Sequence, residues 1–112
     1  TATDDNLASG AIVNTSAHLL TYVIDASGGG NCKLYVRSKG DVAAATDSPT
    51  ASSTTFNGGA VTATNATFGA MNTNATFTLF SDAFLGRCVI YASALTDEQR
   101  STVENDLIGA YL

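Results

Sequence analysis

The acidic residues and the one histidine are the side chains of this sequence that could carry out catalysis. Hydrolysis of a glycosidic bond needs two carboxyl groups held close together, one of them as general acid. The two glutamates, Glu98 and Glu104, instead both fall near the C-terminus, in a segment with a helical pattern. A Ser/His/Asp triad would depend on His18, and no Gly-x-Ser-x-Gly nucleophile elbow accompanies it. We therefore expect that the chain is not an enzyme.

A stripe of two cations around an aromatic ring is the best candidate for ligand binding. Lys33, Tyr35 and Arg37 alternate with apolar residues, so they point to one face of a predicted strand. An aromatic ring can stack on the apolar face of a sugar, with the cations hydrogen-bonding its hydroxyls. We add Asp41 and Asp47, from the loop that follows, to this candidate site. The alternative is an ordinary solvated strand face.

The elements that would position this stripe form a predicted β-hairpin. His18–Asp25 and Cys32–Ser38 both read as strands, and the first is apolar on both faces, which is typical of a strand covered on both sides. The glycine-rich residues 26–31 between them favour a tight turn. Phosphate binding is the weaker alternative, because a strand follows these glycines and not a helix. The long loop Lys39–Thr54 is typical of a binding loop or of a contact with a neighbour.

The second half of the sequence predicts three more strands and a C-terminal helix. We expect strands at about 60–68, 76–80 and 84–91, the last nearly all apolar and therefore central. A helix over 96–111 follows, and Thr96 and Gln99 have the spacing of a capping box at its start. Val103, Leu107 and Tyr111 recur every four residues and, with Ile108 beside them, predict the apolar stripe that docks on the sheet. We expect one domain over 1–112, with residues 1–10 as an N-terminal arm.

Composition excludes several classes of function. The chain has 112 residues, a net charge of −5 and only 13% charged residues. Its five basic residues are too few for a nucleic-acid interface, which needs clustered Lys and Arg. No apolar run approaches the roughly 18 residues of a membrane span. The weakly charged surface of Thr, Ser, Asn and Ala is typical of a protein that packs against other proteins.

The remaining chemistry-bearing residues predict neither a metal site nor a cofactor. The loop aspartates lack the dense oxygen spacing of a calcium loop, so Ca²⁺ is only a weak alternative. Cys32 and Cys88 belong to no Cys-x-x-Cys motif, and one histidine cannot complete a zinc site. Two buried thiols are the simpler interpretation of these cysteines, and a disulfide is the other. The chain begins at Thr1 and its methionine is Met71, so we expect it to be processed, excised from a longer protein or only partly represented.

The C-terminal third resembles a known family. The order strand, Ile90-Tyr91, Ala94-Leu-Thr-Asp-Glu-Gln-Arg100 and amphipathic helix is similar to the end of concanavalin A-like lectin/glucanase domains of the LamG type. His18–Asp25, Lys33–Val36 and Phe68-Gly-Ala70 resemble upstream parts of the same domains. The resemblance implies an all-β fold, an antiparallel jelly-roll β-sandwich with a short C-terminal helix. Such domains are longer than this chain, so the resemblance also implies a sandwich that is incomplete here.

The resemblance and the composition together set the functional expectation. We expect a non-catalytic surface or structural module of a bacteriophage virion or of a secreted bacterial assembly, with lectin-like binding of a cell-surface glycan. The alternative is a purely structural decoration or fibre protein that binds no sugar, and a glycoside hydrolase fragment is a more distant one. An incomplete sandwich exposes strand edges that pair with other chains, so we expect an oligomer with other protein subunits as partners. The expected location is extracellular or on a virion surface.

Overall fold

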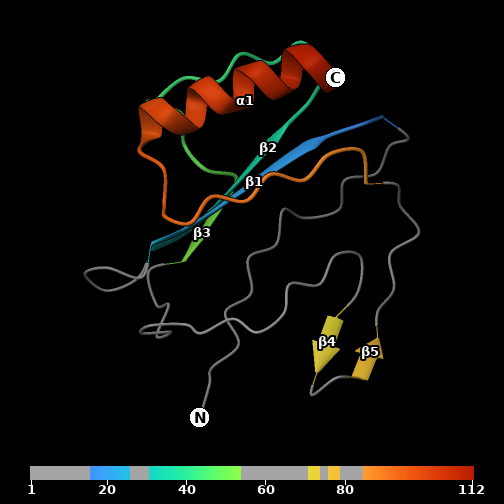
Figure 1. Ribbon diagram of the computed structural model, residues 1–112. Coiled ribbons are helices and arrows are strands. Elements are labelled where there is room, and N and C mark those ends of the chain that lie inside the picture. The colour runs from blue at the N-terminus through green and yellow to red at the C-terminus, as the bar shows by residue number, and fades with distance from the viewer. Residues whose placement is uncertain (1–15, 26–30, 54–70, 74–75, 79–84) are drawn as a thin grey trace. The chain divides into compact units, whose positions relative to one another are not determined.

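The computed structural model describes residues 16–25, 31–53, 71–73, 76–78 and 85–112 (Figure 1). The chain divides into two compact units. One unit contains Thr1–Ala60 and Tyr91–Leu112, and the other contains Val61–Ile90. The predicted arm at residues 1–10 and the predicted strand at about 60–68 lie outside the described residues.

The first unit contains a three-stranded antiparallel sheet with the strand order β1-β2-β3. Strands β1 (Leu19–Asp25) and β2 (Asn31–Arg37) are those of the predicted hairpin, and their antiparallel pairing is confirmed. Residues 26–30, which connect them, lie outside the described residues. Strand β3 (Ala51–Ser53) pairs with the first half of β2 and occupies part of the segment that we predicted as loop.

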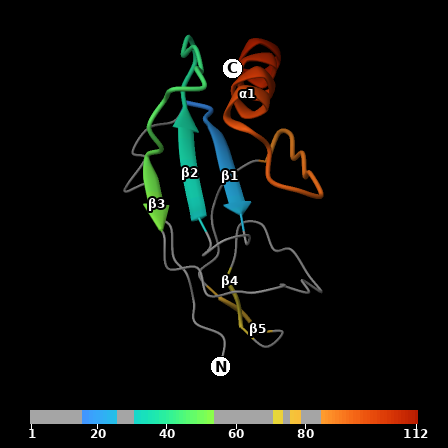
Figure 2. The same cartoon turned by 90° about the vertical axis from the view of Figure 1, so that its left-hand side faces the viewer.

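The pairing register assigns the residues of β1 and β2 to two faces. Leu20 pairs with Val36, and Ile24 pairs with Cys32, so their side chains share one face of the sheet. Thr21 pairs with Tyr35 on the opposite face. We call the face that carries Tyr35 the helix face, because Arg100 of helix α1 (Asp97–Tyr111) lies over the Tyr35 ring. Figure 2 shows α1 alongside β1. We call the other face the open face.

Loop 38–50 leaves β2 and returns to it, and a backbone hydrogen bond closes a turn near its start. In this turn, the Asp41 amide donates to the Ser38 carbonyl at 3.1 Å, and Gly40 has φ 86°. A glycine suits this position because a side chain would strain a positive φ. The Thr50 amide then donates to the Leu34 carbonyl at 2.8 Å, which ties the end of the loop to β2.

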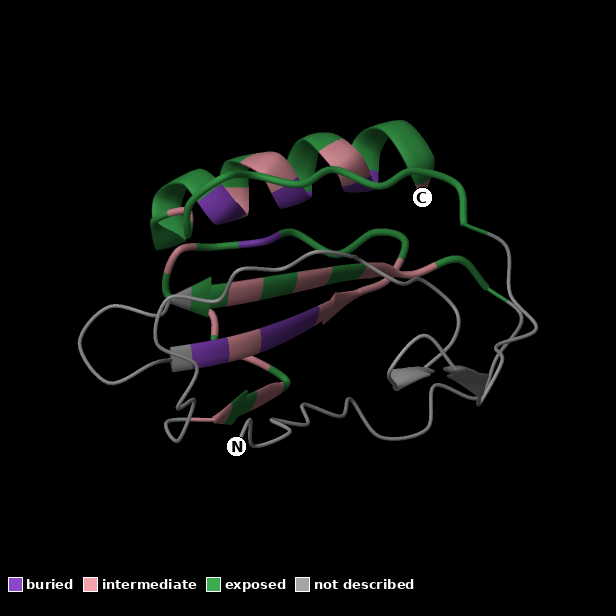
Figure 3. Ribbon diagram, turned by 60° about the horizontal axis from the view of Figure 1, so that its bottom comes forward, coloured by how far each residue is buried: buried purple, intermediate pink, exposed green. Residues whose placement is uncertain are grey.

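The buried residues of the described ranges lie on both faces of β2, in loop 38–50 and in α1. The apolar ones come from all three elements, and Figure 3 shows the buried positions of α1 on the side turned toward the sheet. They are Cys32, Leu34, Tyr35, Ala43 and Ile108. The helix also buries Arg100 and Glu104, each only 1% exposed. Two of the three buried residues of α1 are therefore charged.

The second unit contains a two-stranded antiparallel hairpin of β4 (Met71–Thr73) and β5 (Thr76–Thr78). Strand β5 falls inside the strand that we predicted at 76–80. Strand β4 occupies part of the connection that we predicted between two strands. Both short strands fall in a segment that is rich in threonine and asparagine.

The prediction of an all-β antiparallel sandwich was wrong. The described residues form an open three-stranded sheet with one C-terminal helix, a mixed α/β arrangement. The segment predicted as the central last strand has no strand over 85–91, and Leu85 and Ile90 are 65% and 73% exposed. Its apolar run is compatible with a strand, but a strand also needs a hydrogen-bonded neighbour, which a sequence pattern does not supply.

Candidate functional site

The largest concentration of charged side chains among the described residues joins α1 to β2. The Glu104 carboxylate accepts through Oε2 from Arg37 Nε at 3.1 Å, from Arg37 Nη2 at 2.9 Å and from Arg100 Nη1 at 2.8 Å. The side chains of Glu104 and Arg100 are 1% exposed, and that of Arg37 is 12% exposed. One buried carboxylate thus lies between two guanidinium groups from different elements.

The Tyr35 ring forms the apolar floor of this arrangement. The Arg100 guanidinium carbon lies 3.9 Å from the ring centroid, and that of Arg37 lies 5.5 Å from it. A cation over an aromatic face is attracted by the electron-rich face of the ring, by about 2 kcal/mol when water is excluded. Tyr35 is itself 2% exposed. We call Tyr35, Arg37, Asp47, Arg100 and Glu104 the ion-pair cluster.

Asp47 brings loop 38–50 into the ion-pair cluster. Its carboxylate lies 3.0 Å from Arg37 Nη1, and it also accepts from the Ala44 amide at 2.9 Å. The hydrogen bond from the Ala44 amide, followed by the charge of Arg37, holds the pKa of Asp47 below its ordinary value of 3.8, and desolvation opposes them. The Asp47 side chain is 30% exposed, so water screens this outer ion pair more than the inner ones.

Three further hydrogen bonds, made by two side chains, hold the helix to the same loop. Asn105 accepts from the Ala43 amide at 2.8 Å and donates to the Ala43 carbonyl at 3.0 Å. Arg100 Nη2 donates to the Ala44 carbonyl at 3.0 Å. One side-chain amide thereby satisfies both backbone groups of a buried loop residue, as β-pairing would. The contacts fix both the position of α1 and the path of the loop.

The start of α1 is set by its own sequence. The Gln99 amide donates to Thr96 Oγ1 at 3.2 Å, and the Thr96 amide donates to Gln99 Oε1 at 3.0 Å. This is the reciprocal capping box that the spacing of the two residues predicts. Asp97 and Glu98 in the first turn add favourable charge at the positive end of the helix dipole.

The buried side of α1 differs from the predicted docking stripe. The buried residues are Arg100, Glu104 and Ile108, whereas Val103 and Leu107 are partly exposed and Tyr111 is 53% exposed. Both sets repeat every four residues, so both are helical faces. We chose the apolar set because apolar residues usually face the core. Sequence reasoning missed one signal. Arg100 and Glu104 are oppositely charged, lie four residues apart and share a helical face with Ile108.

The predicted ligand stripe is divided by this packing. Tyr35 and Arg37 belong to the ion-pair cluster, so the Tyr35 ring is covered and cannot stack on a sugar. Lys33 is on the same face and is partly exposed. Of the two loop aspartates, Asp47 joins Arg37, whereas Asp41 accepts from the Ser38 amide at 2.7 Å. Three of the five predicted residues, Tyr35, Arg37 and Asp47, therefore lie together, and their contacts hold the fold rather than a ligand.

His18 and Ser38 lie close together where β1 begins and β2 ends. Ser38 Oγ and His18 Nδ1 are 3.2 Å apart. In a catalytic triad the carboxylate orients the histidine ring. Here the Asp41 carboxylate instead holds the backbone amide of Ser38, within the turn that follows β2. We interpret the pair as a contact that holds the loop to the hairpin.

The cysteines are both free thiols, and they differ in environment. Cys32 is buried in β2 at 4% exposure, whereas Cys88 is exposed. The interpretation as two buried thiols therefore holds for Cys32 alone, and the alternative of a disulfide is not observed. Among the described residues, no group of three or more His, Cys, Asp or Glu side chains is arranged to hold a metal ion.

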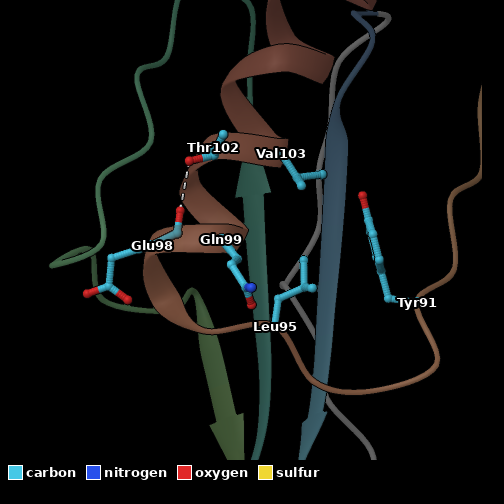
Figure 4. A pocket seen from close by; sticks show the side chains of 6 residues that line it. All are labelled: Tyr91, Leu95, Glu98, Gln99, Thr102 and Val103. Atoms are coloured by element: carbon cyan, nitrogen blue, oxygen red, sulfur yellow. Dashed lines mark hydrogen bonds between the residues drawn. The ribbon is translucent and has the colours of Figure 1, made fainter.

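A shallow hollow of about 380 Å³ lies beside the first turns of α1 (Figure 4). Tyr91 faces Leu95 and Val103 across it, while the Glu98 carboxylate points away. Thr102 also lines it, and its hydroxyl donates to the Glu98 carbonyl at 2.9 Å. The hollow is lined mainly by apolar side-chain surface, so it can accept a small apolar group.

Comparisons with known proteins do not assign the chain. No family model, curated protein or solved structure matches it. The resemblance to LamG-type domains therefore stays a prediction from the residues that carry it. In the described ranges, no helix has the length and apolar character needed to cross a membrane.

Proposed function

We propose that this chain is a non-catalytic structural or surface module that packs against other protein subunits in a larger assembly. The observation that supports this most is a row of three large apolar side chains on the open face of β1. Leu20, Tyr22 and Ile24 are 53%, 54% and 54% exposed. We call them the β1 row.

The β1 row differs from scattered surface hydrophobics because its members are consecutive on one face. Residues i, i+2 and i+4 of a strand point the same way, so their exposed areas are contiguous. Contiguous apolar area is a mark of interaction surfaces, whereas single exposed apolar residues are ordinary. The low charged fraction of 13% favours the same interpretation, because little charge is available to repel a partner.

The charged residues of the first unit support a structural role for the helix face. Arg37, Arg100, Glu104 and Asp47 neutralise one another where α1 meets the sheet. Glycan binding through Lys33, Tyr35 and Arg37 is not part of the proposal, because the Tyr35 ring is covered. Location on a virion or outside the cell stays a prediction of the sequence.

Association of the purified chain tests the proposal. Sedimentation velocity over a wide concentration range should show wild-type species larger than a monomer. Leu20→Glu and Ile24→Glu should shift them to a monomer, because each places a charge in the buried interface. Ser52→Glu is the matched control, since it adds the same charge to an exposed position on the helix-face side of the same sheet.

Circular dichroism distinguishes the proposed outcome from loss of folding. The proposal requires that the Glu variants stay folded while they lose association. A wild-type chain that is monomeric throughout, together with Glu variants that unfold, would mean that the β1 row is covered by its own chain. That result would overturn the proposal.

A further inference from the structure

We draw no further inference here: the strongest candidate, the shallow apolar hollow between Tyr91 and the first turns of helix α1, carries none because nothing in the described part of the chain shows what covers it.

Discussion

The two faces of the β1-β2 hairpin are built by different means. On the helix face, ion pairs and hydrogen bonds hold the packed residues together. Glu104 pairs with Arg37, and the Arg37 guanidinium lies over the Tyr35 ring. On the open face, β2 contributes buried Cys32 and Leu34, while the neighbouring side chains of β1 remain half exposed. An alternating strand pattern therefore assigns residues to faces without indicating what covers each face.

Polar packing of this kind has consequences for stability. A buried ion pair gains little over an apolar contact of the same shape, but breaking it by removing one partner leaves an uncompensated charge. The helix face should therefore be intolerant of single substitutions, although its net contribution to folding is moderate. The β1 row on the open face should show the reverse, with tolerance in folding and sensitivity in association.

Two tyrosines provide the most direct test of this difference. Tyr35 is 2% exposed and Tyr22 is 54% exposed, on opposite faces of paired strands. We expect Tyr35→Ala to lower the free energy of unfolding by about 3–5 kcal/mol, because it leaves a cavity and removes the floor under Arg100. Tyr22→Ala should cost less than half as much. Urea denaturation followed by circular dichroism measures both, and equal losses would contradict the distinction between the faces.

Removal of the central carboxylate should have the next largest effect. Glu104→Gln keeps the size of the side chain but leaves Arg37 and Arg100 without their shared negative charge. We expect a loss of about 3 kcal/mol in the free energy of unfolding. Glu98→Gln is the matched control on the exposed side of the same helix and should change it by less than about 0.5 kcal/mol. A Glu104→Gln variant as stable as the wild type would show that the ion-pair cluster does not hold α1.

Local features of the fold could be predicted from sequence. The strands of the hairpin follow from β-prone residues on either side of a glycine-rich segment, and the helix start follows from Thr96 and Gln99. Each of these depends on contacts between residues that are close along the chain. Their patterns are therefore visible in a single sequence.

The packing between elements could not be predicted in the same way. The contacts of Glu104 with Arg37 and of Asn105 with Ala43 join residues more than sixty positions apart. Nothing in the local sequence of Arg37 indicates a buried ion pair, because a cation on an alternating strand usually faces water. The same limit explains the predicted sugar site. Exposure of Tyr35 was inferred from its charged neighbours, and one of them, Arg37, is itself covered through its ion pair with Glu104 of α1.

Loss of the helix cap should have a smaller effect, and it tests the part of α1 that is local. Thr96→Ala removes the hydroxyl that accepts from the Gln99 amide. We expect a loss of about 1 kcal/mol in the free energy of unfolding. Thr102→Ala is the control, because it removes a hydroxyl within the same helix without exposing an uncapped amide. If Thr96→Ala cost as much as Glu104→Gln, the cap and the ion-pair cluster would contribute equally to the stability of α1, which contradicts this prediction.

The pH dependence of Asp47 should give the smallest effect. The Ala44 amide and Arg37 lower its pKa in the folded state, so the folded protein binds a proton less readily than the unfolded chain. By linkage, the resulting stability is complete above the ordinary pKa of 3.8 and is lost as the pH falls through the lower folded pKa. Asp47→Asn should therefore flatten the decline of stability below about pH 4, when urea midpoints are measured between neutral and acid pH. Asp106→Asn, on an exposed position of α1, is the control. A wild-type slope retained in Asp47→Asn would show that Asp47 does not cause the acid sensitivity.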